Sequence, residues 1–277
     1  MTRLIAGLLL ALLVQPAGAA RLDFSGEAVA GGLLIGTTES DAQVFIDGNR
    51  VRVSPQGSFL VGFHREEPEP VIVKVVYSDG REARRRFEVR QREYRVQRID
   101  GLPPRQVSPT EEDLKRIRRE YALARRARAR DDARTDFLVD FVWPTIGPIS
   151  GVYGSQRVLN GKPRRPHYGV DVAVPTGTPV HAPAPGLVTL AHPDMYFSGG
   201  TLILDHGHGL SSSFLHLSKL LVSVGQRVKQ GDIIAEVGAT GRVTGAHLDW
   251  RMNLKKKRLD PALLVGPMPQ TQAGAGR

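Results

Sequence analysis

The stretch from Gly241 to Trp250 constrains the fold more than any other part of the chain. It is punctuated by glycines and then changes to alternating polar and apolar residues. Such alternation predicts a β-strand with His247 and Asp249 on one face and Leu248 and Trp250 on the other. The Cα atoms of His247 and Asp249 would be about 6.5 Å apart, so both side chains can reach one site. A histidine beside a carboxylate could supply a metal ligand and a proton-transfer group. The alternative is a hairpin strand with an exposed polar face.

The first 19 residues predict a secretory signal peptide. Arg3 is their only charge, an apolar run extends from Leu4 to Val14, and Ala17-Gly18-Ala19 suits a cleavage site. The apolar run is too short to span a bilayer comfortably, although an uncleaved anchor is the alternative. We therefore expect an exported protein of the periplasm or cell envelope, with no membrane span after signal cleavage.

The composition limits how this exported chain is held together and what it meets. It has no cysteine, so packing or a metal must stabilise it, and a lipid-modified N-terminal cysteine is excluded. The net charge of +10 suggests an acidic partner. Nucleic acid is the usual candidate, but an exported chain meets cell-wall polymers or anionic lipid surfaces instead.

Residues 21–100 predict a small β-sandwich of immunoglobulin-like type. Two β-prone segments, 44–46 and 51–53, flank the hairpin signal Asp47-Gly48-Asn49. Further strand-like runs follow at 58–63, 71–77, 87–89 and 94–97. The region holds a single histidine, His64, and no clustered chemistry. It is either a binding or positioning module or an inert spacer.

A basic helical linker is expected over residues 101–136, after the boundary at Leu102-Pro103-Pro104. Ser108 is the expected N-cap, with Pro109 at the first helical position and Glu111 closing a capping box. The helix should run to about Asp131, with an apolar stripe formed by Leu114, Ile117, Tyr121 and Ala124.

The charge of this helix has two interpretations. Residues 115–130 contain eight Lys/Arg and one Glu. The helix is then an arm that contacts an anionic polymer, or a connector with a solvated face whose apolar stripe docks on a neighbour. We favour the connector.

Residues 137–265 predict a second, mostly β domain, because they are rich in Gly, Pro and Val. Strand-like runs occur at 187–191, 201–204, 212–217 and 233–237. The tail 266–277 is low in bulky apolar residues and is expected to be disordered. Seven of the eight histidines lie between positions 167 and 247, which is a higher concentration than scattered surface histidines would give.

His167 and Asp171 form a candidate metal half-site. The intervening glycine and β-branched residue argue against a helix, and in a straight strand the two Cα atoms would be about 13 Å apart. The backbone must therefore bend for both to reach one ion, and Gly169 is placed to allow it.

The other histidines have weaker local signals. His216 lies in Phe214-Leu215-His216-Leu217-Ser218, and a lone histidine among apolar residues is more often a core residue than a catalyst. His206 and His208 lie in a turn-like segment and are expected to be structural. His181 and His192 have no partner pattern.

Taken together, the order His-x-x-x-Asp, isolated His, and Gly-Ala-His-Leu-Asp-Trp resembles the lysostaphin-type (LytM-domain) zinc metallopeptidases, which cut peptide bonds in peptidoglycan. The resemblance covers roughly residues 140–262. Segments that match the family's running pattern are 160–164, 177–182, 186–188, 224–232 and 237–242. It implies two antiparallel sheets with a narrow groove between loops, in which a stem or cross-bridge peptide would lie.

The resemblance implies one zinc ion and a set of site residues. His167 and Asp171 fall on two zinc-ligand positions, and His216 and His247 fall on the two catalytic histidines. Asp249 falls where the family usually has a third ligand, the second histidine of His-x-His. This is the one departure among the core positions.

Asp249 leaves two interpretations open. An aspartate oxygen can ligate zinc, so one histidine and two aspartates still give three ligands and an open position. The formal charge with a divalent ion would then be near zero rather than +1, which makes the metal a weaker Lewis acid. Alternatively, the site is degenerate and the protein binds peptidoglycan without cutting it. We favour a working site, because both catalytic-position histidines are present.

Two rival classes share parts of this pattern. A non-catalytic regulator of wall hydrolases would have this fold. A protein regulator of the enzyme itself is a further candidate partner. A lipoyl- or biotinyl-type carrier would explain Gly-x-x-Val-x-x-Gly-Asp at 225–232, but the surroundings of Lys229 and the predicted export argue against it.

Overall fold

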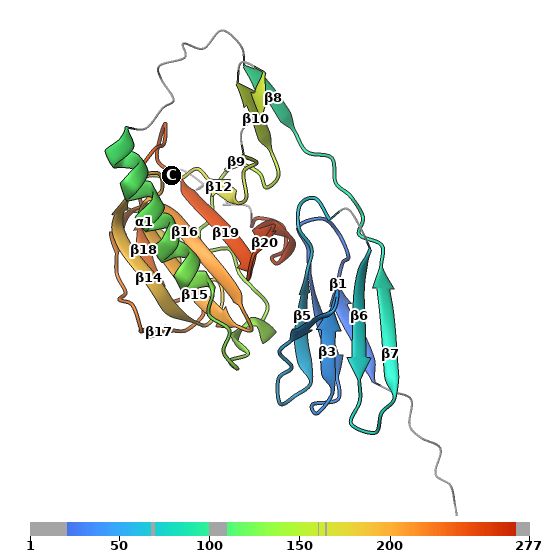
Figure 1. Cartoon of the computed structure of the whole chain (residues 1–277). Coiled ribbons are helices and arrows are strands. Elements are labelled where there is room, and N and C mark those ends of the chain that lie inside the picture. Colours follow the sequence, from blue (N-terminus) through green and yellow to red (C-terminus); the bar gives the residue numbers. More distant parts are fainter. Residues whose placement is uncertain (1–20, 68–69, 100–109, 160, 164, 270–277) are drawn as a thin grey trace, which may run out of the picture.

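The computed structural model of the chain describes residues 21–67, 70–99, 110–159, 161–163 and 165–269. The predicted signal peptide, the Leu-Pro-Pro boundary and the end of the tail lie outside these residues. Within them the protein is mostly β with antiparallel sheets, as predicted (Figure 1). None of the described helices is long and apolar enough to cross a membrane.

Two antiparallel sheets form a sandwich at the N-terminal end of the described chain. One has the order β1-β2-β5 and the other β4-β3-β6-β7. Their bounds are Leu22–Gly26 (β1), Leu33–Thr38 (β2), Gln43–Ile46 (β3), Asn49–Val51 (β4), Ser58–Gly62 (β5), Val71–Val76 (β6) and Glu82–Phe87 (β7). Apolar side chains from both sheets share one core that includes Val44, Phe59, Val61 and Val73. The more specific immunoglobulin-like type stays a prediction.

The last two predicted strands of this region are placed differently. β7 ends at Phe87, where the 87–89 strand was expected to begin. β8 (Val96–Ile99) leaves the sandwich and pairs in parallel with β10 (Gln156–Leu159), which in turn pairs with β11 (Lys162–Pro163). Local alternation predicts an extended strand but not its partner, because any free edge can satisfy its backbone groups.

Helix α1 (Glu111–Arg128) begins two residues later and ends three residues earlier than the sequence indicated. Its N-cap is Thr110, not Ser108, and Asp113 rather than Glu111 closes the capping box. Thr110 Oγ1 accepts from the Asp113 amide at 3.1 Å, and the Thr110 amide donates to Asp113 Oδ2 at 3.1 Å. The Thr-x-x-Asp spacing forms the same kind of capping box as the predicted Ser-x-x-Glu motif, two residues further along the chain. The helix ends three residues before Asp131.

The predicted apolar stripe of α1 is only partly its docking face. Leu114 and Tyr121 are 41% and 56% exposed, so the prediction was wrong for both. Instead Ala124 and Ala127 pack on Leu190, Met195 and Ile203. The docking face is rotated because polar anchors share it: Arg116 pairs with Asp194, and Glu120 accepts from the Tyr196 amide at 2.8 Å. The helix therefore docks on the sheet, and its role as a connector stays a prediction.

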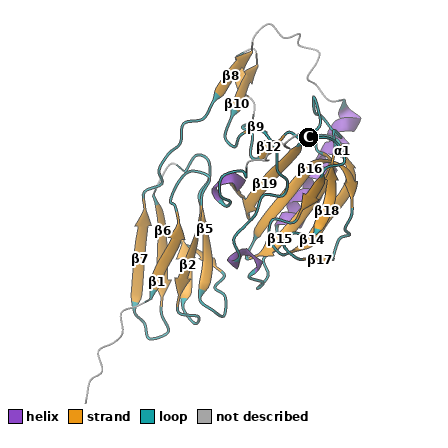
Figure 2. Cartoon of the chain, turned by 180° about the vertical axis from the view of Figure 1, so that it is seen from behind, coloured by secondary structure: helices purple, strands orange, loops and turns teal. Residues whose placement is uncertain are grey.

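The second half of the chain is built on a ten-stranded antiparallel sheet with the central order β17-β14-β15-β16-β19-β12-β9. The bounds are Ile149–Gly151 (β9), Val170–Val172 (β12), Pro179–His181 (β13), Gly186–Met195 (β14), Gly199–Gly207 (β15), Leu210–Leu220 (β16), Arg227–Val228 (β17), Ile233–Val237 (β18), Leu248–Leu254 (β19) and Lys257–Leu259 (β20). β18 pairs with β13 and β16, and β20 with β19. Short 3-10 helices lie at Asp136–Leu138 and Pro261–Leu263. Figure 2 shows α1 against one face of this sheet.

Strand β19 alternates as predicted. Leu248, Trp250 and Met252 are fully buried in the main apolar core, together with Leu202 and Phe214 of the neighbouring strands. Asp249 and Arg251 therefore lie on the opposite face of the sheet.

The sandwich packs on the second half through several polar contacts. Arg65 donates to the Gly154 carbonyl at 3.0 and 2.8 Å, and Lys257 pairs with Glu67 at 2.9 Å. The His64 and Tyr168 rings lie 6.0 Å apart, which brings the sandwich next to the segment that carries His167.

Candidate active site

Three predicted metal ligands converge at one point. One ligand atom each of His167, Asp171 and Asp249 lie within 4.8 Å of one another. The antiparallel pairing of β12 with β19 causes this, because it places Asp171 directly opposite Asp249. Directly opposed residues project to the same face of a sheet.

Two glycines make room for these carboxylates. The backbone bends at Gly169, as expected, but without a left-handed φ. Its role is space, since a Cβ there would lie 2.5 Å from Asp249 Oδ1 and 2.7 Å from Arg251 Cγ. A Cβ on Gly151 would lie 2.1 Å from Asp171 Oδ2. Both positions therefore exclude a side chain next to the site.

His216 is turned into the site by a strained backbone. Its φ is +65°, a left-handed conformation that is costly for a residue other than glycine. The register between β15 and β16 shifts between Gly200 and Leu202, so β16 has an extra residue beside His216. The bulge explains why a histidine among apolar residues is not simply a core histidine here.

Both catalytic-position histidines are held in the same tautomer. His216 Nδ1 donates to the Thr240 carbonyl at 3.0 Å, and His247 Nδ1 donates to the Gly245 carbonyl at 2.9 Å. A carbonyl only accepts, so in the neutral form of either ring Nε2 carries the lone pair. The two rings lie 4.9 Å apart.

The free Nε2 atoms face the carboxylates of the cluster. His216 Nε2 lies 4.0 Å from Asp249 Oδ2, and His247 Nε2 lies 4.0 Å from Asp171 Oδ1. Burial lowers the pKa of His216 and outweighs the opposing charge of Asp249, which favours the neutral ring.

The donor atoms themselves fit a divalent metal. His167 Nε2 and Asp171 Oδ1 are buried atoms that face each other at 3.2 Å without hydrogen-bond geometry. Such orphaned polar atoms are costly unless something else satisfies them. One imidazole nitrogen and two carboxylate oxygens are the kind of ligands that zinc takes in three-ligand catalytic sites.

Arg251 is part of the site and was missed in the sequence. Its Nε lies 2.9 Å from Asp249 Oδ1, and its Nη2 lies 2.5 Å from Asp249 Oδ2. This pairing keeps the pKa of Asp249 well below its usual value, although burial alone would raise it. The expected charge of a two-aspartate site is thus offset by one neighbouring cation. The alternation of β19 carried this signal, because Arg251 follows Asp249 by two residues.

The remaining histidines lie away from the cluster. His206 is fully buried, and its ring nitrogens contact the Pro185 carbonyl at 2.7 Å and Ser212 Oγ at 2.8 Å. His208 packs on Phe137 with a ring distance of 4.9 Å. The contacts of His206 fit the expected structural role, whereas both ring nitrogens of His208 are buried without a hydrogen-bond partner. His181 Nδ1 contacts the Gly231 carbonyl.

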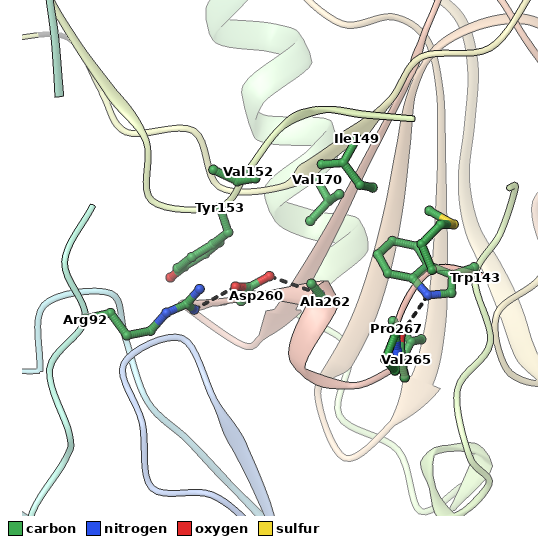
Figure 3. A pocket seen from close by; sticks show the side chains of 12 residues that line it. Arg92, Trp143, Ile149, Val152, Tyr153, Val170, Asp260, Ala262, Val265 and Pro267 are labelled. Atoms are coloured by element: carbon green, nitrogen blue, oxygen red, sulfur yellow. Dashed lines mark hydrogen bonds and ion pairs between the residues drawn. The ribbon is translucent and has the colours of Figure 1, made fainter. Parts of the chain in front are cut away.

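A pocket between the two halves of the molecule contains none of the five predicted site residues. It is lined by Trp143, Tyr153, Val170 and the Arg92–Asp260 ion pair, among others (Figure 3). Val170 precedes Asp171 and points to the other face of β12. The groove that the family resemblance implies stays a prediction.

Comparisons with known proteins match the part of the chain that carries this cluster. The sequence model of peptidase family M23 matches residues 165–261, which include all five predicted site residues. A crystal structure described as a putative peptidase M23 from Pseudomonas aeruginosa is 32% identical, with a TM-score of 0.67 over 87% of this chain and 96% of that one.

Two curated proteins are similar over the same region. The peptidoglycan DD-endopeptidase ShyA of Vibrio cholerae is 43% identical over 37% of this chain and 24% of its own length. An uncharacterized metalloprotease of Haemophilus influenzae is 41% identical over 40% of this chain and 23% of its own. The matches thus span about a quarter of these relatives. Because the Pseudomonas protein is matched over nearly its whole length, the chain belongs to peptidase family M23.

Proposed function

We propose that this protein is a zinc-dependent endopeptidase that hydrolyses peptide bonds in the stem or cross-link peptides of peptidoglycan. The observation that carries the proposal is the convergence of His167, Asp171 and Asp249 within 4.8 Å. Two histidines with free Nε2 atoms border this cluster, which gives metal ligands and proton-transfer groups in one place.

His167, Asp171 and Asp249 would hold one zinc ion. When bound, such an ion supplies a Lewis acid that polarises the scissile carbonyl and acidifies water. Three protein ligands would leave a position for a further ligand, and His216 and His247 would lie beside it, since each Nε2 is 4.0 Å from a ligand carboxylate. Arg251 fixes the carboxylate of Asp249 through two nitrogens, while each carboxylate oxygen keeps a second lone pair.

His216 and His247 would move the protons of the reaction. Each Nε2 lone pair can accept a proton from the attacking water, and the ring that has accepted it can donate to the leaving amine. The other ring is then available to stabilise negative charge on the former carbonyl oxygen. The carbonyls of Thr240 and Gly245 keep both rings oriented throughout.

The relatives and the sequence support a location in the cell envelope and a division of the chain into three functional regions. The DD-endopeptidase relative acts on peptidoglycan, and the predicted signal peptide directs this chain to the periplasm or cell envelope. Residues 137–265 would be the peptidase domain, residues 101–136 its linker, and residues 21–100 a module that positions it on the wall. A protein regulator is a further proposed partner.

The test is incubation of the full chain with purified peptidoglycan, with and without chelator, followed by muropeptide analysis. We expect chelator-sensitive products whose identity reveals the bond that is cut. His167→Ala should abolish them, whereas His181→Ala is the matched control. The absence of any chelator-sensitive product from the wild type would overturn the proposal.

A second candidate function is a non-cutting regulator that binds peptidoglycan. The specific observation in its favour is that Asp249 departs from the family's usual histidine and is paired with Arg251. A purified protein that binds intact sacculi, holds no metal and releases no fragments would decide for the regulator.

A further inference from the structure

Three arginines from three elements gather beside the candidate metal site. We call Arg128 at the end of α1, Arg251 on β19 and Arg258 on β20 the arginine cluster. Arg128 donates through Nε and Nη2 to Ser213 Oγ at 3.3 and 3.1 Å, and Ser213 is the direct cross-strand partner of Arg251. Arg258 lies opposite Asn253 and donates to its Oδ1 at 3.1 Å.

The cluster shares a sheet face with the metal site. Asp249, Arg251 and Asn253 alternate along β19 and so project to one side. Ile203 of β15 is the cross-strand partner of Ser213, and α1 packs on Ile203. The helix therefore covers this same face. It places Arg128 on Ser213 of β16, the strand next to the one that carries Arg251.

The cluster has an excess of positive charge. Arg251 is paired with Asp249, but among the described residues Arg128 and Arg258 bond only to the neutral oxygens of Ser213 and Asn253. Burial, followed by repulsion from the other two arginines, lowers the pKa of Arg128 to about 9. Half-buried cations without a counter-charge are costly, and a bound anion would relieve that cost.

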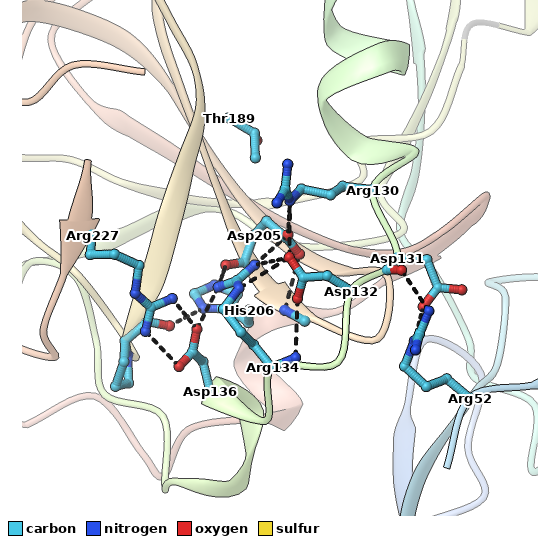
Figure 4. Close-up of polar contacts among 12 residues, drawn as sticks. Arg52, Arg130, Asp131, Asp132, Arg134, Asp136, Thr189, Asp205, His206 and Arg227 are labelled. Atoms are coloured by element: carbon cyan, nitrogen blue, oxygen red, sulfur yellow. Dashed lines mark hydrogen bonds and ion pairs between the residues drawn. The ribbon is translucent and has the colours of Figure 1, made fainter. Parts of the chain in front are cut away.

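The ends of α1 are fixed, so Arg128 is held in place before any ligand binds. Past its C-terminus, Arg130 and Arg134 pair with Asp205, and Asp136 pairs with Arg227 (Figure 4). At its other end, Arg116 pairs with Asp194. A preorganised guanidinium loses little freedom on binding, which favours affinity.

The chemistry of the cluster selects a carboxylate. Planar guanidinium groups bind carboxylates through two parallel hydrogen bonds. A D,D-peptide bond of peptidoglycan carries a free carboxylate on the same carbon as the scissile nitrogen. This holds for a D-alanine cross-link to diaminopimelate and for a terminal D-amino acid. That carboxylate would lie within one residue of the bond held at the metal site.

We propose that the arginine cluster is a substrate subsite that binds the free carboxylate of the peptide next to the scissile bond. This inference rests on the proposed endopeptidase function. Arg128 and Arg258 would make the contact, and Arg251 would link the subsite to Asp249.

The test uses a D-alanine–diaminopimelate cross-linked muropeptide dimer in two forms, with its diaminopimelate carboxylates free or amidated. For the wild type we expect KM to be about 10- to 100-fold lower for the free acid, the loss typical of a charge-assisted hydrogen bond. Arg128→Gln and Arg258→Gln should remove this preference by raising KM for the free acid to the value for the amidated form. Arg125→Gln, on an exposed position of the same helix, is the matched control.

A binding measurement separates this inference from the proposed function. Calorimetry with chelator-treated protein should show the same preference for the free acid, and its loss in Arg128→Gln. If the dimer binds selectively but is never cut, the endopeptidase proposal fails and the subsite stands. If both forms are cut and bound equally well, the subsite is overturned. It is also overturned if Arg128→Gln weakens the binding of inorganic phosphate but leaves the preference for the free-acid dimer unchanged.

Discussion

The second half of the molecule has two histidine-rich regions that differ in what their ring nitrogens contact. At the β15–β16 turn, both nitrogens of His206 have partners, and the ring is fully buried. At the metal site, His216 and His247 each have one tethered nitrogen and one that faces carboxylates. Both regions lie among apolar residues. A free nitrogen alone does not distinguish the two kinds of histidine, because both ring nitrogens of His208 at the same turn also have no hydrogen-bond partner. What distinguishes His216 and His247 is that the free nitrogen faces the carboxylates of the metal cluster.

Removal of a metal ligand should have the largest effect. Asp171→Ala takes one of three ligand atoms from the proposed site, so bound zinc should fall from one equivalent to none and hydrolysis to the detection limit. Metal content measured on the purified protein checks the first result and muropeptide release the second. His206→Ala is the contrasting variant and should keep its zinc. A zinc-replete Asp171→Ala protein would contradict the assigned ligand set.

Replacement of the proton-transfer rings should cost less than loss of the metal. His216→Gln and His247→Gln remove the free Nε2 base, and kcat should fall by about 100- to 10,000-fold with zinc retained. Steady-state kinetics alongside metal analysis separate this effect from loss of the ion. If either variant lost its metal instead, that histidine would belong to the ligand set.

Arg251 should have an intermediate effect that depends on Asp249. Arg251→Gln frees the carboxylate and should weaken zinc affinity about 10- to 100-fold, the range for groups that orient metal ligands. Once Asp249→His supplies a neutral ligand, the same arginine loses its ion-pair partner and faces a zinc site of net positive charge, with Asp171 as the remaining carboxylate nearby. Its replacement should then be neutral or favourable.

A double-mutant cycle on zinc affinity measures this coupling. Arg258→Gln is the control, since Arg258 pairs with Asn253 and not with a proposed ligand. Equal effects of Arg251→Gln in both backgrounds would show that the arginine does not act through Asp249.

The sequence predicted those parts of the site that depend on local pattern and family resemblance. The alternation around Asp249 indicated its strand and its face, and the bend at Gly169 followed from the spacing of His167 and Asp171. The bulge at His216 could not be predicted, because it depends on how β15 pairs with β16. Arg251 was within reach of the same alternation that identified Asp249.

The fold was predictable to a similar extent. Hairpins and strands with strong local signals were correct, including the run 233–237 that forms β18. β8 was assigned to the sandwich because its parallel partner β10 lies far away in the sequence. The docking face of α1 was misjudged because small alanines and polar anchors, rather than the largest apolar residues, contact the sheet. Arg128 was read only as surface charge for the same reason.

The smallest expected effect concerns the structural histidine and pH. Burial lowers the pKa of His206 to about 4, below the value near 6.5 of an unfolded chain. Between these values the unfolded chain binds more protons than the folded one, so stability is fully present above about pH 6.5 and is lost as pH falls toward 4. Thermal unfolding from pH 7.5 to 4.5 should show this slope, and His206→Gln should be less stable at neutral pH but have a shallower slope. An equally steep slope in the variant would assign the pH dependence to other groups, with His208, whose pKa burial also lowers to about 4, as the next to replace.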